Sequence, residues 1–378
     1  MKEKIKKYFT VPDSRRMIYD YIRILACLGI ICLHTTGDRS EPLGVFFQTT
    51  SRIALPLFVL LSGVLLLGNP KKEPYLKFYW KRFVKIVVPY LIYGAIYTGW
   101  VNPGHVIPEK LTWEGVKTVI LCFPDSVKLN MKMETVQYFH LWFMLMIIGF
   151  YIVAPFFQRG LPALSDHDLK WLFAIMLVTY AVIDYLPTFG VEIGIINFFS
   201  DWEIFFLAGY VLSRFDNKKT HIGFLIVGTL AAVYMFFGKW KFPDHLGANF
   251  YDLAPAMMLA TCGAFSGLML FESIIPKWKW LNWIVSKISN YTFSIYMIHG
   301  IMLVNHMAFH PGYNQTFIGT IREVVEVFIK CLIFALIFDN IVTNNVKRIL
   351  NLLASIVTKL VNKLANKVAP KTQSVETE

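Results

Sequence analysis

The chain has 378 residues, of which 56% are hydrophobic and only 16% charged, and its mean hydropathy is +0.50. Ordinary soluble domains carry roughly a quarter charged residues, so this composition excludes a soluble globular protein. The net charge of +12 does not indicate nucleic acid as a partner, because the basic residues stand in short clusters between apolar runs.

The apolar residues fall in runs long enough to cross a bilayer, which takes about 20 residues of helix. We therefore predict an all-α polytopic membrane protein with about ten transmembrane helices. The predicted spans cover residues 17–36, 45–67, 84–101, 138–158, 169–186, 198–213, 221–238, 252–272, 284–307 and 324–343.

The basic residues predict the orientation of these spans. Of the 37 Lys and Arg, 26 lie in the two terminal segments and in alternate connections, and eight lie in the other connections. Because basic residues concentrate in cytoplasmic loops, both termini are predicted to be cytoplasmic. The chain then divides into a basic N-terminus (1–16), a membrane domain (17–343) and a basic amphipathic tail (344–378), which is expected to contact anionic membrane lipids.

The cysteines and histidines do not predict a metal. The five cysteines show no CxxC spacing, and no Cys/His cluster has metal-ligand spacing. We therefore expect neither a disulfide framework nor a metal site.

The first span carries charged groups that are costly inside a membrane and therefore mark candidate sites. Arg23 and His34 are eleven residues apart, about three helical turns, so both project to the same face. Asp20 lies near that face. The simpler alternative is an ion pair between Asp20 and Arg23 with His34 as an interfacial residue.

Other polar residues lie at the predicted outer ends of spans. Arg52, on the second span, is predicted to reach the depth of His34. His140 begins the fourth span, where taken alone it reads as an interfacial anchor, and Asp201 and Glu203 begin the sixth, where plain interfacial solvation is the alternative. His299 lies within the ninth span, where a buried histidine bonded to a hydroxyl is the commonest role.

The inner mouth of the third span carries Arg82 and Lys85. Ordinary positive-inside anchoring explains such residues. The functional alternative is a site for phosphates, which basic groups bind through charge-assisted hydrogen bonds.

Together these residues resemble the acyltransferase-3 family of membrane acyltransferases, most nearly the stand-alone branch that O-acetylates bacterial surface polysaccharides. The resemblance covers residues from about 17 to 343. It rests on the Arg-x10-His pattern of Arg23 and His34 and on SRIALPLFVLLSG around Arg52. Weaker matches follow in order: KRFVKIVVPY (81–90), HLWFM (140–144), FFLAGYVL (205–212) and ISNYTFSIYMIH (288–299).

One position departs from the family pattern. The family often has Arg-x-x-Arg at the third span, and here Lys85 follows Arg82. Lysine keeps the charge and loses the bidentate fork, so the phosphate assignment of Lys85 is the weaker one.

The resemblance implies a bacterial plasma-membrane O-acyltransferase. Acetyl-CoA or another acyl-CoA is then the cytoplasmic donor, and the hydroxyl of a surface glycan or its lipid-linked precursor is the acceptor. His34 is predicted to be the general base, with Arg23, Arg52 and Glu203 assisting. Arg82, Lys85 and Arg23 are predicted to bind the donor, and His140, Asp201 and His299 the acceptor.

Two other classes compete with the enzyme. An exporter of a polysaccharide or a lipid-linked glycan also suits intramembrane Arg and His residues. A membrane scaffold gives no reason for the alignment of Arg23 with His34 and ranks last. The sequence does not specify the acyl chain length, the acceptor sugar or the carboxylate that assists His34, and a homodimer is compatible with it.

Overall fold

The computed structural model describes residues 15–37, 40–68, 73–100, 140–191, 201–242, 254–309 and 316–368. These residues form helices and their connections and contain no strand, which confirms the all-α class for the described part of the chain. Residues 1–14 of the predicted N-terminal segment and 369–378 of the predicted tail lie outside it.

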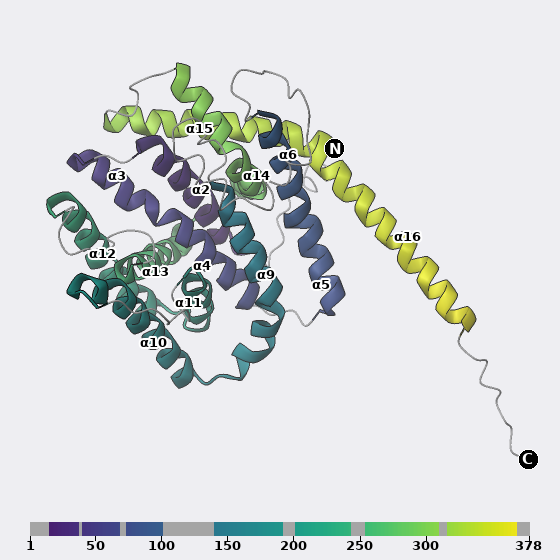
Figure 1. The fold of residues 1–378 in the computed structure, drawn as a ribbon, viewed down its shortest axis with the longest axis horizontal. Helices are drawn as coiled ribbons and strands as arrows, with labels where there is room; N and C mark the ends of the chain where they lie inside the picture. Colours follow the sequence, from purple (N-terminus) through teal and green to yellow (C-terminus); the bar gives the residue numbers. More distant parts are fainter. Residues whose placement is uncertain are drawn as a thin grey trace, which may run out of the picture.

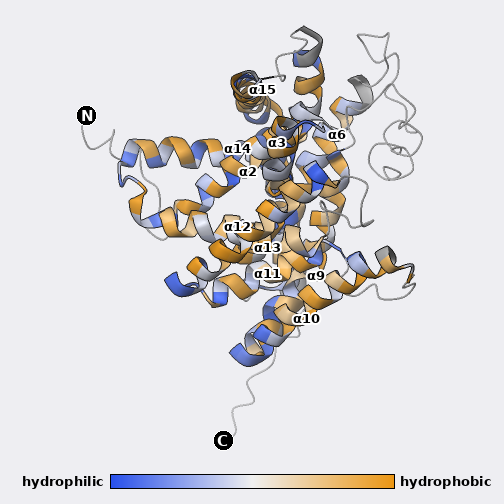
Figure 2. Ribbon diagram, turned by 90° about the vertical axis from the view of Figure 1, so that its left-hand side faces the viewer, coloured by the Kyte–Doolittle hydropathy of each residue, from blue (hydrophilic) through white to orange (hydrophobic). Residues whose placement is uncertain are grey.

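The membrane domain is a bundle of helices in which hydrophobic residues predominate (Figures 1 and 2). In chain order the described helices are α2 (Ile18–Thr36), α3 (Pro42–Arg52), α4 (Ala54–Leu67), α5 (Tyr75–Arg82), α6 (Val88–Trp100), α9 (Trp142–Gly160), α10 (Asp166–Tyr185), α11 (Glu203–Arg214), α12 (Lys218–Lys241), α13 (Pro255–Leu270), α14 (Lys279–Phe309), α15 (Phe317–Phe338) and α16 (Asn344–Val368). Short helical turns extend several of them: η3 (Leu161–Ala163), η4 (Leu186–Phe189) and η5 (Phe271–Ile274) are 3-10, and η1 (Phe83–Val87) and η7 (Asp339–Thr343) are π-helical.

Five of the predicted spans are confirmed as helices long and apolar enough to cross a membrane. They cover Ile18–Thr36, Pro42–Leu67, Trp142–Ala163, Lys218–Lys241 and Pro255–Ile274. Helices also occupy the described parts of the other five predicted ranges. Their crossing of the membrane and the cytoplasmic placement of both termini stay predictions.

Helix α2 is the centre of the bundle. It packs against α3, α4, α14 and α15, and Figure 1 shows it between α3, α4 and α14. Ile22, Ala26 and Ile31 on α2 are almost fully buried. Polar groups on the same helix are therefore held inside the bundle by apolar packing on several sides.

Two pairs of glycines allow close contacts between described helices. Gly63 on α4 faces Gly209 on α11, and Gly228 on α12 faces Gly263 on α13. A Cβ atom at Gly63 would lie 1.9 Å from the carbonyl oxygen of Phe206. Small residues of this kind let membrane helices approach at backbone distance, and here they fix α11 against α4.

Candidate functional site

One end of α2 opens into a cationic cavity of about 590 Å³. Arg23, Lys81, Arg82 and Lys85 line it, together with Tyr151 and apolar residues of α4 and α9. Its volume is within the range of ordinary ligand pockets. Four basic side chains on one cavity suit a ligand with several phosphate or carboxylate groups.

Arg82 and Lys85 reach this cavity from a helix that changes its winding. Arg82 ends α5, and Lys85 lies in the π-helical turn η1 that follows it. The Arg82 guanidinium packs over the rings of Phe78 and Tyr151, with 4.3 Å and 5.9 Å to the ring centres. These aromatic faces hold the guanidinium in place by cation–π contact.

Asp20 holds the neighbouring basic residues in place. Arg15 donates two hydrogen bonds to the Asp20 carboxylate, at 2.7 and 2.6 Å, and Ser289 Oγ donates a third at 2.7 Å. Arg23 Nη1 lies 3.4 Å from the same carboxylate, which confirms the predicted pair. Because Arg15 makes the stronger contact, the Arg23 charge remains directed at the cavity. Asp20 therefore belongs to the Arg23 end of α2, about 21 Å along the helix from His34.

A second, smaller cavity lies toward the other end of α2. This histidine cavity has a volume of about 150 Å³ and is lined by His34, Arg52 and His140, with Trp142, Trp202 and Tyr296 among its other walls. Arg52 and His34 therefore meet, as the helical rise predicts. Arg23 does not line this cavity, so the structure places it with the cationic residues and apart from His34.

Three histidine rings, from α2, from the turn before α9 and from α14, form a cluster beside the histidine cavity. The ring centres of His34 and His299 are 5.3 Å apart, and those of His140 and His299 are 4.3 Å apart. His140 and His299 are both buried. The burial of His140 argues against the interfacial-anchor alternative, because an anchor would face the lipid headgroups.

The hydrogen bonds of His299 define its tautomer. His299 Nδ1 lies 2.6 Å from the carbonyl oxygen of Tyr296. A carbonyl only accepts hydrogen bonds, so Nδ1 carries the proton in the neutral ring and Nε2 presents a lone pair. Nε2 is buried and has no hydrogen-bond partner among the described residues. The predicted contact of His299 with a hydroxyl is thus replaced by a contact with the backbone.

Tyr296 is the residue that the sequence reasoning missed. It lines both cavities, and its hydroxyl donates a 2.5 Å hydrogen bond to the carbonyl of His140. It lies three residues before His299, so both side chains are on one face of α14. That spacing within SIYMIH was the available signal. Tyr296 stands at the boundary between the basic residues and the histidines.

Asp201 and Glu203 do not line either cavity. The Asp201 carboxylate accepts a hydrogen bond from the backbone N–H of Trp202, and Glu203 Oε1 accepts one from that of Asp201 at 3.3 Å. Both residues organise the start of α11, and Trp202 between them lines the histidine cavity. Asp201 and Glu203 therefore lie next to a wall of that cavity without lining it.

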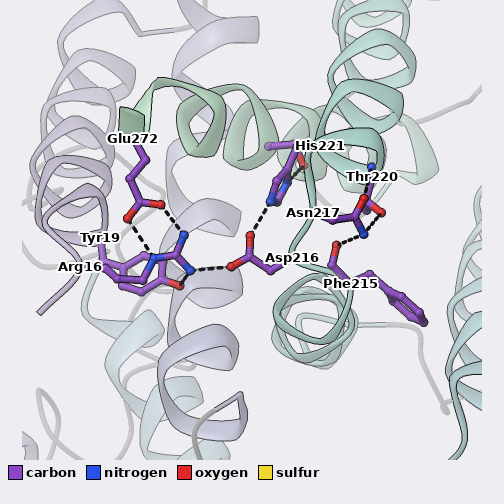
Figure 3. A network of polar contacts seen from close by, with 9 residues as sticks. Arg16, Tyr19, Phe215, Asp216, Asn217, Thr220, His221 and Glu272 are labelled. Atoms are coloured by element: carbon purple, nitrogen blue, oxygen red, sulfur yellow. Dashed lines mark hydrogen bonds and ion pairs between the residues drawn. The ribbon is translucent and has the colours of Figure 1, made fainter. Parts of the chain in front are cut away.

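A polar network elsewhere in the bundle has the residue types of a nucleophilic triad. His221 lies 3.2 Å from Ser266 Oγ and 2.8 Å from Asp216, and Arg16 joins Asp216 to Glu272 (Figure 3). Ser266 is fully buried, so no substrate reaches it. This network connects the start of α2 with α12 and η5, and we assign it a structural role and no catalytic one. Within the described residues, no group of His, Cys, Asp and Glu could hold a metal ion.

The sequence of the chain is similar to those of known membrane acyltransferases. Residues 18–339 match the sequence model of the family described as an acyltransferase domain, Acyl_transf_3. The "Putative membrane-bound acyltransferase YfiQ" of Bacillus subtilis (strain 168) is 24% identical over 314 residues, which cover 75% of this chain and 80% of that protein. No solved structure matches the chain.

Proposed function

The chain belongs to this acyltransferase family, and we propose that it is a bacterial plasma-membrane O-acyltransferase with acetyl-CoA, or another acyl-CoA, as donor. The acceptor in this proposal is a hydroxyl of a surface glycan or of its lipid-linked precursor. The observation that carries it is the placement of two cavities along α2, one lined by basic residues and one by His34 and Arg52, with Tyr296 on both.

The cationic cavity supplies the features that a coenzyme A donor needs. The nucleotide end of coenzyme A carries phosphates, for which Arg82 offers a planar fork and Lys85 a point charge. Lys81 also lines the cavity, and its ammonium group is ion-paired with Glu73 at 2.6 Å. Arg23, on α2, adds a further positive charge to the same cavity. The pantetheine arm then extends between apolar walls toward Tyr296, and the thioester reaches the histidine cavity.

In the proposed reaction His34 acts as general base. The acceptor oxygen attacks the thioester carbonyl while His34 takes the hydroxyl proton, a role suited to an imidazole. An oxyanion forms on the carbonyl, and in this proposal it is stabilised by the guanidinium of Arg52, which lines the same cavity. The carbon–sulfur bond then breaks, the new ester is released, and the coenzyme A thiolate takes the proton from His34.

The neighbouring residues hold His34 in position in this scheme. The His299 ring stacks on His34 at 5.3 Å, with an interplanar angle of 22°. The backbone of Tyr296 fixes the His299 tautomer, and Tyr296 in turn bonds to the backbone of His140. His140 lines the histidine cavity and is the residue that contacts the glycan in this scheme, whereas the buried His299 acts on the acceptor only through its contacts with His34 and His140.

The test measures free thiol released from acetyl-CoA by purified protein in nanodiscs with an acceptor glycan. We expect His34→Ala to fold normally and to lose about 10²- to 10⁴-fold in rate, the usual contribution of a general base. His167→Ala is the matched control, because His167 is exposed on α10 and contacts Trp171. Full activity of His34→Ala refutes the mechanism. Glycan movement without thiol release by the wild-type protein identifies an exporter instead.

A further inference from the structure

The last helix presents an apolar face that the rest of the described chain leaves uncovered. Helix α16 follows η7 and extends away from the bundle (Figure 1). Apolar side chains along it are between 46% and 62% exposed: Ile349, Leu352, Leu353, Ile356, Val357, Leu360 and Val361. Exposed apolar surface of this extent marks an interaction site.

The exposed apolar residues share one face of α16. They recur at intervals of three and four residues, whereas Asn351, Ser355, Thr358 and Asn362 fall on the opposite face. The apolar face is wider than the two positions per heptad that form a coiled-coil seam. This width is typical of a helix that lies at a membrane surface.

The charges of α16 have a single sign. Residues 344–368 contain Lys347, Arg348, Lys359, Lys363 and Lys367 and no Asp or Glu. Two copies of such a helix repel each other and offer no opposite charges for pairing, which argues against a second copy of the chain as the occupant. An anionic surface complements the helix along its length.

The base of α16 is attached to the wall of the cationic cavity. Trp80 Nε1 donates a 3.1 Å hydrogen bond to Asn351 Oδ1, and α16 packs against η1, which carries Lys85. The helix therefore leaves the bundle at the end where the basic residues of the cavity gather. In a membrane-embedded bundle, a helix that starts beside the cationic cavity contacts the lipid headgroups from its first turns.

We propose that α16 binds an anionic lipid surface, with its apolar face in the acyl-chain boundary and its basic residues on lipid phosphates. The helix then lies along the leaflet at the mouth of the cationic cavity. This inference does not depend on the proposed reaction. Each basic residue near such a surface contributes roughly fivefold to binding, which corresponds to about 1 kcal/mol.

The experiment uses full-length protein in nanodiscs of phosphatidylcholine alone or with added phosphatidylglycerol. An environment-sensitive fluorescent amino acid is placed at position 356 on the apolar face or at position 358 on the polar face. Lipids brominated on their acyl chains then report contact. We expect strong quenching at position 356, weak quenching at 358, and an increase at 356 when phosphatidylglycerol is present.

Two variants of α16 distinguish the effect of its positive charges from the effect of changes on its polar face. Lys359→Gln/Lys363→Gln/Lys367→Gln is expected to weaken surface binding about 10²-fold and to remove the dependence on phosphatidylglycerol. The matched control Ser355→Asn/Thr358→Asn/Asn362→Gln changes the polar face and leaves quenching at position 356 unchanged. Equal quenching at 356 and 358 overturns the proposal, as does quenching that is the same in both lipids. Cross-linking between two copies through α16, in place of lipid contact, overturns it as well.

Discussion

The contact between α4 and α11 allows a quantitative prediction for Gly63→Ala. A Cβ atom at position 63 would lie 1.9 Å from Phe206 O, 2.9 Å from Phe206 C and 3.3 Å from Gly209 Cα. All three atoms are backbone, so no side chain can move aside and the two helices must separate by more than about 1 Å. Overpacking of this kind costs about 1–3 kcal/mol, which exceeds the ~0.5–1 kcal/mol that alanine gains over glycine in a helix.

The same substitution in α9 provides the matched control. Gly149 also lies inside a helix, and a Cβ atom there meets nothing within 4 Å. We expect Gly63→Ala to lower the free energy of unfolding by about 1–2 kcal/mol and Gly149→Ala to leave it unchanged or slightly higher. Equilibrium unfolding in mixed micelles measures both. Gly63→Ala should also reduce activity, because a shifted α11 moves Trp202. Equal stability of the two variants refutes the argument.

Three further predictions concern the charged groups. Arg82→Gln should raise the KM for the donor about 10- to 100-fold with little change in kcat. Lys219→Gln, which changes an exposed residue of α12, should change neither constant. Thiol release measured against donor concentration gives both constants. Asp20→Asn should lower the free energy of unfolding by about 2 kcal/mol, since it removes the charged hydrogen-bond acceptor shared by the part-exposed Arg15 and Arg23. Unchanged stability contradicts this account. Burial acts to raise the pKa of Asp216, but the hydrogen bonds from His221 and Arg16 outweigh it and lower that pKa below its ordinary 3.8. The ionised Asp216 carboxylate therefore stabilises the fold at neutral pH, and this stabilisation is lost as the pH falls through the lowered pKa. Asp216→Asn should abolish this contribution to the pH dependence of the free energy of unfolding, as measured by unfolding at a series of acidic pH values.

The site residues that sequence reasoning predicted best are those whose depth follows from the helical rise, on one helix or on two consecutive helices. The eleven-residue interval between Arg23 and His34 sets their separation along α2, and the helical rise brings Arg52 to the depth of His34. Helical spacing also suggests the ion pair of Asp20 with Arg23, which the structure confirms at 3.4 Å. Such local geometry follows from the backbone alone.

Residues whose role depends on packing between helices were not predicted in this way. For His140 and His299 the sequence favoured a structural role over a functional one. Nothing in either segment indicates that the turn before α9 packs against α14 and brings the two ring centres to 4.3 Å. Tyr296 is one of 18 tyrosines, and only the packed bundle shows that it borders both cavities. The π-helical turn that holds Lys85 likewise has no distinct sequence signal.

The separation of Arg23 from His34 lets α2 contribute a residue to each of the two cavities. The two residues share a face of α2, yet they open into different cavities because different helices cover each half of that face. A base near four cationic groups would be harder to protonate during the reaction, since like charges disfavour a second positive charge. With about 16 Å of helix between Arg23 and His34, the basic residues can attract an anionic donor, while Arg52 lines the same cavity as His34. Adding a positive charge beside the histidines, for example with Ile30→Lys on α2, should therefore impair catalysis more than donor binding. A KM effect without a kcat effect in that variant would contradict this division.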